Sequence, residues 1–312
     1  MDNSLHTPLN TLGETLHYLK LSSVFYCKSD LSGSWGVSLP SMPETSMFHI
    51  VTAGACSIEC EGQSLELKAG DFVFVPKGQG HILRSDSTAK ISDLFDLPTK
   101  QISQYYETLS IGDHKNDKTT ILCGVVKLEH PSASFLINAM PSMIYLESTK
   151  TTYSNWMSHS VRLIAEEAEQ THLGGETILT RLADVLVIQG LRYWITNSDT
   201  KQGWLSAIQD KRIGKSLALI HSKPGTQWTL ESLAKEIGMS RTAFATKFTE
   251  LVGEPMLQYL TKWRMNLAVM KLKEGEKVSP DLIEQLGYKS ESAFRRTFKK
   301  IIGCNTNAIL ID

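Results

Sequence analysis

Two stretches near the end of the chain decide the fold: residues 240–253 read SRTAFATKFTELVG, and residues 290–303 read SESAFRRTFKKIIG. The second stretch repeats the pattern of the first fifty residues further along. In each copy, apolar side chains recur at spacings of i, i+4, i+7 and i+8, which places them on one face of a helix. A serine begins each copy as a helix N-cap, and a glycine ends it as a C-terminal stop. The repeat therefore predicts two amphipathic helices of the same design.

A short apolar segment precedes each of these helices. Residues 230–237 lead into the turn Gly238-Met239-Ser240, and residues 282–286 lead into Gly287-Tyr288-Lys289-Ser290. A short helix, a glycine turn and a second helix form a helix-turn-helix, whose second helix enters the major groove of DNA. The alternative is a pair of packed helical hairpins with solvated outer faces. The duplication favours a protein that reads double-stranded DNA at two places.

The outward faces of the two copies differ in charge. The first carries small and hydroxylated side chains that suit base edges, whereas the second carries a cluster of cations that suits phosphates. The pattern predicts these DNA-binding residues: Ser240, Arg241, Thr242, Ala245, Thr246, Lys247, Ser290, Glu291, Arg295, Arg296 and Lys299.

With these motifs, residues 204–303 resemble the DNA-binding domain of the AraC/XylS family of bacterial transcription regulators. The resemblance implies two helix-turn-helix subdomains joined by a central helix, here at about residues 255–273. At 1.5 Å per residue this helix would be about 27 Å long, which suits two recognition helices one DNA turn apart. The chain departs from the family pattern at Ile283, where alanine is usual, and at residues 304–306, where Ser-Pro is usual. Both departures suggest an altered or looser second subdomain.

The charge distribution agrees with a DNA reader at one end only. The whole chain has 32 Lys+Arg and 33 Asp+Glu, a net charge of -1. Residues 204–312 hold 17 Lys+Arg and 11 Asp+Glu, a balance of +6, which leaves 15 against 22, or −7, for residues 1–203. A basic half attached to an acidic half fits a DNA-binding domain joined to a domain with another task.

Cysteine usage and hydropathy indicate a cytoplasmic protein. Five scattered cysteines do not form a disulfide framework, which agrees with a reducing compartment. We find neither a signal peptide nor an apolar run of about 18 residues, so secretion and membrane spanning are not expected.

The first half of the chain predicts a β-structure. Between residues 19 and 128, short alternating or apolar runs are separated by glycine turns, as in a β-barrel or jelly roll. The segment from Gly70 to His81 has the form G(X)5PXG(X)2H. This is similar to the second cupin motif, and residues 20–200 broadly resemble the cupin-type effector domain of one AraC subgroup.

The cupin resemblance raises the question of a metal. The usual first motif has two closely spaced histidines, but here His49 is followed by Ile50-Val51 where the second should fall. His49, His81 and Cys123 could still converge and bind zinc, since imidazole and thiolate are its ordinary ligands. The favoured interpretation is that they line the pocket of a small-molecule effector or are core residues. Trp35 is predicted to be a pocket wall, with core packing as the alternative.

Residues 156–196 change to helical spacing, with a break at Gly174-Gly175. The second of these helices is more apolar than one face of a monomer requires, so we expect it to form a homodimer through Leu182, Leu186 and Leu191. Packing on its own barrel is the alternative. The polar stretch 196–202 is the expected linker.

The expected fold class is α+β. Residues 1–150 would form the cupin-like domain, 151–202 the dimerisation segment and linker, and 203–312 the DNA-binding domain. The expected function is a sequence-specific, non-catalytic transcription regulator that binds an operator and a small-molecule effector, and RNA polymerase if it is an activator. Two alternatives stay open: a metal-dependent cupin enzyme with a helical appendage, and a constitutive DNA-binding protein whose barrel only dimerises.

Overall fold

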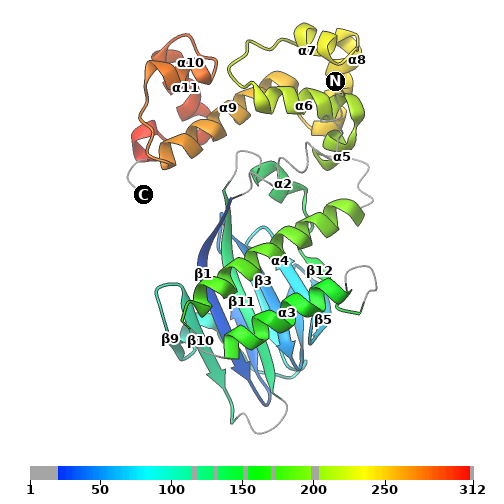
Figure 1. Cartoon of the computed structure of the whole chain (residues 1–312), viewed down its shortest axis with the longest axis vertical. Coiled ribbons are helices and arrows are strands. Elements are labelled where there is room, and N and C mark those ends of the chain that lie inside the picture. The colour runs from blue at the N-terminus through cyan, green and yellow to red at the C-terminus, as the bar shows by residue number, and fades with distance from the viewer. Residues whose placement is uncertain are drawn as a thin grey trace. The chain divides into compact units, whose positions relative to one another are not determined.

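The computed structural model describes residues 20–113, 118–129, 133–149, 154–169, 173–197 and 204–309. They form two compact units (Figure 1). The sheet unit comprises the described parts of Leu21–Leu128 and Met140–Ser198. The helical unit comprises those of Glu129–Ala139 and Asp199–Asp312. The α+β class predicted from the sequence is therefore confirmed.

The described strands of the sheet unit form two sheets, with the orders β12-β6-β3-β11-β1-β10-β9 and β5-β4-β7-β2-β8. A short 3-10 helix, η1 (Leu94–Asp96), follows β8. The strands are β1 (Lys20–Leu31), β2 (Gly36–Leu39), β3 (Ser46–Ala53), β4 (Ala55–Cys60), β5 (Gln63–Lys68), β6 (Phe72–Val75), β7 (His81–Arg84), β8 (Ile91–Asp93), β9 (Thr99–Gln101), β10 (Tyr106–Ile111), β11 (Thr119–Glu129) and β12 (Ile144–Leu146).

One hydrophobic core lies between the two sheets. It joins Val51 and Val73 of the seven-stranded sheet to Ile58 and Leu83 of the five-stranded sheet, all of them buried. Side chains alternate between the two faces of a sheet, so one face of each sheet supplies the residues of this core. Two facing sheets around one core are the arrangement of a jelly roll, as the cupin resemblance implied.

The cupin-like motif forms the turn between β6 and β7. All four residues of β6 are buried, and the chain leaves the strand through Pro76 to Gly78. Gly78 has a φ of 62°, and a Cβ at this position would lie 2.2 Å from the carbonyl oxygen of Met42. Only glycine fits this close approach. The turn then delivers His81 as the first residue of β7, with its side chain buried.

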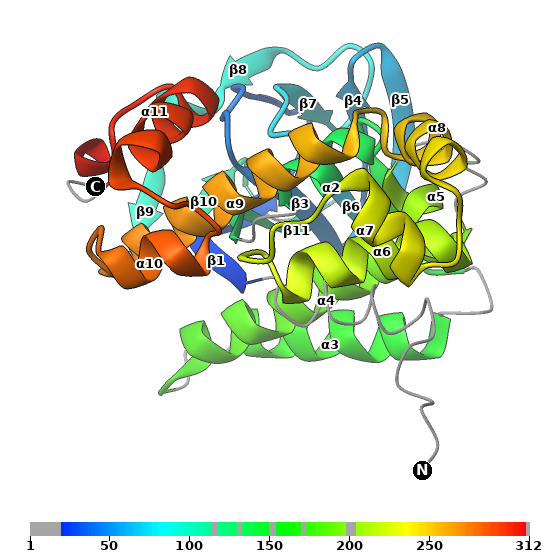
Figure 2. The ribbon, with the colours of Figure 1, turned by 90° about the horizontal axis from the view of Figure 1, so that it is seen from above.

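Two helices, α3 (Ser154–Glu169) and α4 (Gly175–Asn197), pack together and lie across the seven-stranded sheet (Figures 1 and 2). The predicted break is confirmed, since Gly174 lies between them with a φ of 82°. The predicted dimer residues are corrected by their burial: Leu186 and Leu191 are fully buried and Leu182 is half-buried. The apolar excess of α4 therefore covers its own sheet, where Gly190 approaches the ring of Phe72.

The expected linker, residues 196–202, is only partly described. Its first two residues belong to α4, which ends at Asn197. The helix thus extends further than the polar composition of this stretch suggested. Residues 198–202 lie outside the described part of the chain.

The helical unit contains α2 (Ala133–Ala139), α5 (Trp204–Gln209), α6 (Lys211–Ser222), α7 (Leu230–Glu236), α8 (Arg241–Val252), α9 (Met256–Lys273), α10 (Pro280–Gln285), α11 (Glu291–Ile302) and the 3-10 helix η2 (Thr306–Ala308). Helix α2 is an unexpected member, because it lies between β11 and β12 in the sequence. It nevertheless packs against α5 within the helical unit. The domain boundaries expected at residues 150 and 203 do not anticipate this assignment.

No helix among the described residues is long and apolar enough to cross a membrane.

Candidate DNA interface and effector pocket

Both helix-turn-helix motifs form as the sequence predicts. Helices α7 and α8 make the first, and α10 and α11 make the second. The hydroxyl of Ser240 accepts a hydrogen bond from the backbone N–H of Ala243, and Ser290 caps α11 in the same way. Gly253 and Gly303 end the two recognition helices in the left-handed conformation, with φ of 87° and 88°. The two recognition helices are therefore local copies of one design.

Burial separates the two faces of each recognition helix. Phe244 and Phe248 of α8, and Phe294 and Phe298 of α11, are fully buried in the interiors of their subdomains. Arg241, Thr242 and Thr246 are exposed on α8, and Ala245 is half-buried. The exposed face of α8 is thus small and hydroxylated, with one arginine at its N-terminal end.

Lys247, one of the predicted DNA contacts, has a partner inside the protein. Its ammonium lies 2.5 Å from the carboxylate of Asp210, which caps the N-terminus of α6. The carboxylate of Asp210 is partly buried, but its hydrogen bonds to the N–H groups of Ile213 and Arg212 and to Lys247 lower its pKa. Lys247 therefore ties α8 to α6 and has less freedom to reach a base.

Arg295 is similarly engaged. Its Nε donates to Glu291 over 2.6 Å, and its Nη1 donates to the hydroxyl of Thr306 over 2.6 Å. Thr306 is buried in η2, so Arg295 connects the recognition helix to the segment that follows it. Thr306 is one of the residues that stand where the family usually has Ser-Pro after the final glycine.

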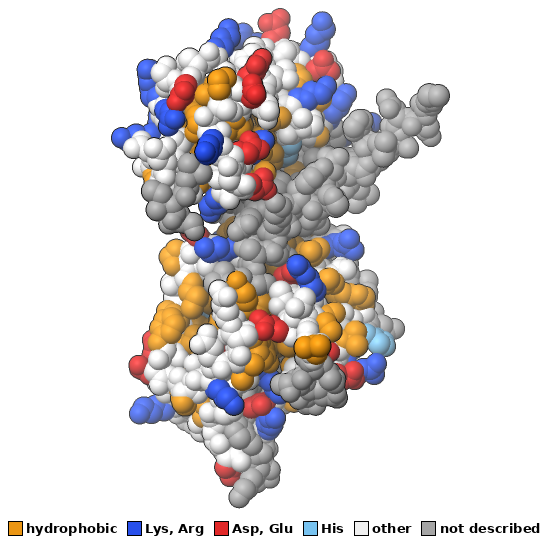
Figure 3. All heavy atoms as spheres, turned by 60° about the vertical axis from the view of Figure 1, so that its left-hand side comes forward, with side chains coloured by type: hydrophobic (Ala, Val, Ile, Leu, Met, Phe, Trp, Pro, Cys, Tyr) orange, Lys and Arg blue, Asp and Glu red, His pale blue; other side chains and the backbone are white. Residues whose placement is uncertain are grey.

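Arg296, Lys299 and Lys300 form the cationic face of α11. All three are exposed, and within the described residues none makes an ion pair. Cations without a protein partner remain available to phosphates. Figure 3 shows Lys and Arg side chains on the surface of the helical unit, in the upper part of the view.

Helix α9 joins the two motifs and agrees with the central helix that the resemblance implied. It starts after Pro255 and has 18 residues. Its C-terminal half contributes Met265, Ala268 and Leu272 to the core of the second subdomain. Ile283, one of the departures from the family pattern, is buried in the same core. The looser second subdomain that this departure suggested is not apparent in its packing.

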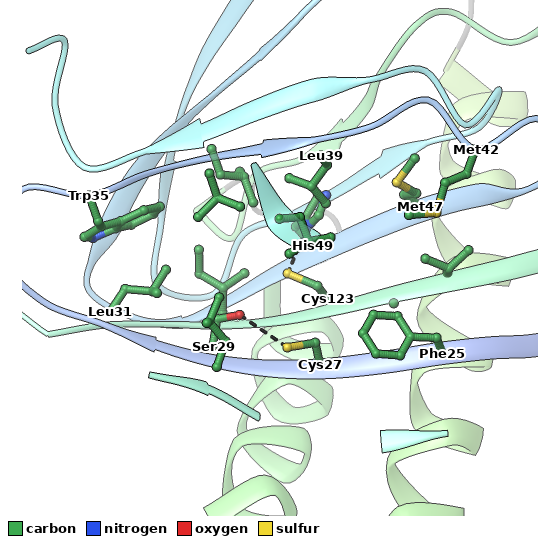
Figure 4. A pocket seen from close by; sticks show the side chains of 17 residues that line it. Phe25, Cys27, Ser29, Leu31, Trp35, Leu39, Met42, Met47, His49 and Cys123 are labelled. Atoms are coloured by element: carbon green, nitrogen blue, oxygen red, sulfur yellow. Dashed lines mark hydrogen bonds between the residues drawn. The ribbon is translucent and has the colours of Figure 1, made fainter. Parts of the chain in front are cut away.

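The second candidate site is a pocket between the two sheets (Figure 4). Seventeen residues line it, and none of them is Lys, Arg, Asp or Glu. Trp35, His49 and Cys123 line it as predicted, whereas His81 lies behind His49 and is not among the lining residues. The few polar side-chain groups of the lining residues are the His49 ring, the Ser29 hydroxyl, the Trp35 indole N–H and the two thiols of Cys27 and Cys123.

Strand pairing brings the predicted site residues together. Cys123 of β11 is directly opposite His49 of β3, and His49 Nδ1 lies 3.0 Å from Cys123 Sγ. His81 comes from the other sheet, and its Nε2 lies 2.7 Å from Nε2 of His49. His81 Nδ1 is 2.9 Å from the carbonyl oxygen of Gln79. The predicted convergence of His49, His81 and Cys123 is therefore present.

The proton positions along this chain follow from the carbonyl at its end. A carbonyl oxygen can only accept, so Nδ1 of His81 donates to Gln79, and Nε2 of a neutral His81 must accept. His49 then donates from Nε2 and accepts at Nδ1 from the Cys123 thiol. We infer a fully neutral chain from Cys123 through His49 and His81 to Gln79.

Burial supports the neutral state. Desolvation and the neighbouring His81 hold the pKa of His49 well below its usual 6.5, and burial also lowers the pKa of His81. Burial raises the pKa of the Cys123 thiol well above 9.0 and that of Cys27 to about 11. A protonated thiol in apolar surroundings is a poor nucleophile and a poor metal ligand.

The zinc site that the sequence left open does not fit this arrangement. A histidine binds a metal through one nitrogen, but here His81 and Cys123 face opposite nitrogens of His49. Two nitrogens on one tetrahedral zinc would also be about 3.3 Å apart, further than the observed 2.7 Å. Within the described part of the chain, no group of three or more His, Cys, Asp and Glu side chains could hold a metal ion.

Several residues that line the pocket carried no prediction in the sequence. Phe25, Cys27, Ser29 and Leu31 all line the pocket from β1. These four residues occupy every second position of the strand, and such a period of two predicts that their side chains share one face of the sheet. Met42 and Met47 also line the pocket, but no sequence pattern distinguishes them from ordinary core residues.

Residues 10–196 match the model of a family described as Cupin, and residues 233–309 match a helix-turn-helix domain. The transcriptional regulator AlkR of Acinetobacter baylyi is 29% identical over 294 residues, which cover 94% of this chain and 95% of AlkR. RclR of Escherichia coli, an RCS-specific transcriptional activator, is 26% identical and covers 82% of this chain and 81% of its own. ToxT of Vibrio cholerae, solved with an unsaturated fatty acid, is 13% identical with a TM-score of 0.36, covering 93% of this chain and 95% of its own.

The two helix-turn-helix motifs and these matches define the class: the protein is a DNA-binding transcription regulator. The chain belongs to the cupin family in its N-terminal part and, as a whole, to the AraC-type regulators that carry such a domain.

Proposed function

We propose that this regulator binds a small, uncharged and largely apolar effector between the two sheets of its cupin domain. The observation that carries the proposal is the lining of the pocket, which contains no charged side chain. A carboxylate or ammonium placed there would lose its hydration without gaining a counterion, which is costly. An uncharged molecule would instead gain from burial of its apolar surface.

The pocket is narrow, so the proposed effector must be slender or must displace side chains. The space open to a water-sized sphere is about 40 Å³. Met42 and Met47 lie in its wall, and methionine is the apolar side chain that adapts most easily to a new shape. If these two side chains moved when an effector binds, binding would directly affect the packing between the sheets.

The test is a thermal-shift comparison of matched probes: short n-alkanols and simple aromatic hydrocarbons against carboxylates of the same length. A ligand that binds only the folded protein stabilises it by about 2.7 kcal/mol at a hundredfold excess over Kd. We expect stabilisation by uncharged probes and none by carboxylates. Leu109→Trp, which fills the pocket from β10, should abolish the shift while leaving DNA binding intact. Stabilisation by carboxylates, or a shift that survives Leu109→Trp, would contradict the proposal.

We also propose that the protein is a homodimer through the outer face of the α3–α4 pair. This face exposes Trp156 and Leu163 of α3 at 37% and 50%, and Ile178 and Val185 of α4 at 46% and 44%. In each helix the two residues are seven positions apart, so they share one side. Figure 3 shows hydrophobic side chains exposed on the sheet unit, in the lower part of the view. Exposed apolar side chains on one side of a helix favour a protein partner, and a second copy is the simplest one.

The proposal also includes the compartment in which the regulator acts and its macromolecular partners. We propose a cytoplasmic regulator that binds an operator in double-stranded DNA and contacts RNA polymerase if it activates. We propose no catalytic role, because both nitrogens of His49 and the thiol of Cys123 are engaged with each other and with His81. The DNA-contact roles of the exposed residues on α8 and α11 are likewise proposals.

A further inference from the structure

Arg264 occupies an unusual position in the helical unit. It lies in the middle of α9, the helix between the two motifs, and is only 9% exposed. Burial lowers its pKa, although Tyr288 opposes this effect. A buried guanidinium requires hydrogen-bond partners for its donors, and these partners show what the residue does.

Arg264 donates two hydrogen bonds to the loop between α6 and α7, which leads into the first helix-turn-helix. Nε donates to the carbonyl of Pro224 over 2.8 Å, and Nη2 donates to that of Thr226 over 2.9 Å. Two parallel donors fix the orientation of this loop as well as its distance from α9.

The other side of the guanidinium faces the second helix-turn-helix. Its central carbon lies 5.9 Å from the centre of the Tyr288 ring, within the range of a cation–π contact. Gly287, in the turn between α10 and α11, has a φ of 76°, and a Cβ there would lie 2.5 Å from Nη2 of Arg264. The turn of the second motif is therefore in direct contact with the arginine that holds the loop of the first.

The loop and the turn also contact each other. Gln227 donates from its side chain to the carbonyl of Gly287 over 2.7 Å. A Cβ on Gly225 would lie 2.7 Å from the carbonyl oxygen of Gln285, the last residue of α10. The approach of Gly287 to Arg264 and that of Gly225 to Gln285 both require glycine, because a Cβ would collide there. Arg264, the loop 224–227 and the turn at Gly287 form one connected contact, which we call the arginine clamp.

We propose that the arginine clamp sets the distance between the two DNA segments that the regulator recognises. Recognition helix α11 directly follows the turn at Gly287, and the loop 224–227 leads into α7, which packs against recognition helix α8. Arg264 is then a positioning residue, which touches no base but fixes where the second helix lies once the first is seated in the major groove. This inference rests on the proposed DNA contacts of both recognition helices.

The test is selection of binding sites from duplex DNA that contains two randomised blocks separated by spacers of different length. The full-length wild type should select one spacer and disfavour a spacer one base pair longer by roughly tenfold, the order of one lost base contact. Arg264→Met and Gln227→Ala should select the same bases within each block but accept neighbouring spacers nearly equally. Gln227 is exposed, so its variant should fold even if Arg264→Met does not.

Arg212→Met provides a matched control, because it removes an exposed arginine from α6, outside the clamp. It should lower affinity for all spacers alike, if at all. If Arg264→Met or Gln227→Ala, when folded, keeps the wild-type spacer preference and only loses affinity, the clamp has no positioning role. If the wild type itself selects a single block without any spacer preference, the proposal that both helices contact DNA fails, and the clamp proposal fails with it.

Discussion

Val185 and Leu186 are neighbours on α4 but differ in exposure: Val185 is 44% exposed, whereas Leu186 is fully buried against the protein's own fold. We expect Val185→Glu to place charges in the proposed dimer interface and to leave the subunit folded. Sedimentation should then show a monomer with an unchanged circular dichroism spectrum. Leu186→Glu is the matched variant, and it should unfold the sheet unit because it buries a charge without a partner. A Val185→Glu protein that remains dimeric would place the interface elsewhere.

Arg295 and Arg296 allow the proposed phosphate contacts to be tested within one helix. Arg296→Ala should weaken binding to all sequences and reduce the slope of log K against log salt by about 0.9. Arg295→Ala should change this slope much less, since Arg295 is engaged with Glu291 and Thr306. The measurement is a salt titration of affinity for the selected operator and for random DNA. Equal slopes for the two variants would contradict the distinction between them.

Arg241→Ala on the first recognition helix should behave differently from Arg296→Ala. A side chain that reads a base contributes about 1–3 kcal/mol of discrimination at one position. We expect the selected site to lose its preference at one or two adjacent base pairs in one block. Lys247→Ala is the comparison variant: because Lys247 pairs with Asp210, its loss should leave base preference unchanged. A broadened preference in Lys247→Ala would mean that its ion pair opens on DNA.

The two buried histidines predict an acid-sensitive sheet unit. His49 and His81 have pKa values below the usual 6.5 in the folded protein, so the unfolded chain binds more protons below that pH. Stability from this pair is complete above pH 6.5 and is lost as the pH falls below it. Thermal unfolding followed against pH should show this loss, and His49→Gln should reduce it. His159→Gln removes an exposed histidine of α3 and is the matched variant, which should retain the loss. An unaltered pH dependence in His49→Gln would contradict the assignment.

Metal binding can be tested with cobalt(II), which reports thiolate coordination by its absorption. We expect no sulfur-to-cobalt band that depends on Cys123, because its thiol is protonated and donates to His49. Cys123→Ser is the matched variant. A band that appears in the wild type and disappears in Cys123→Ser would show that the three residues rearrange around a metal.

The parts of the fold set by local patterns could be predicted from the sequence. The caps at Ser240 and Ser290 and the stops at Gly253 and Gly303 follow from spacing and backbone preference within a few residues. The cupin-like turn was also predictable, because Gly78 and His81 belong to one short motif. The convergence of His49 and Cys123 depended on the resemblance, since strand register is not visible in a single strand.

The errors came from contacts between distant segments. Leu186 and Leu191 were assigned to a dimer because helical periodicity cannot distinguish a partner subunit from the protein's own sheet. The sequence also did not reveal the internal partners of Lys247 and Arg295, because Asp210 and Thr306 are brought to them only by folding. Whether these two side chains contact DNA stays a prediction. Arg264 gave no signal, since a single arginine in a helix does not reveal which carbonyls it will meet.

Helix α2 means that the two functional halves of this regulator cannot be separated by one cut in the chain. A fragment beginning at α5 would lack the helix that packs against it, and that face of α5 would be open to water. The complementary N-terminal fragment would keep α2 without its partner. Exchange of sensor halves between related regulators should therefore succeed only when α2 and α5 come from the same parent. Compatibility between the halves therefore depends partly on α2, a seven-residue helix that lies within the sensor half in the linear order of the chain.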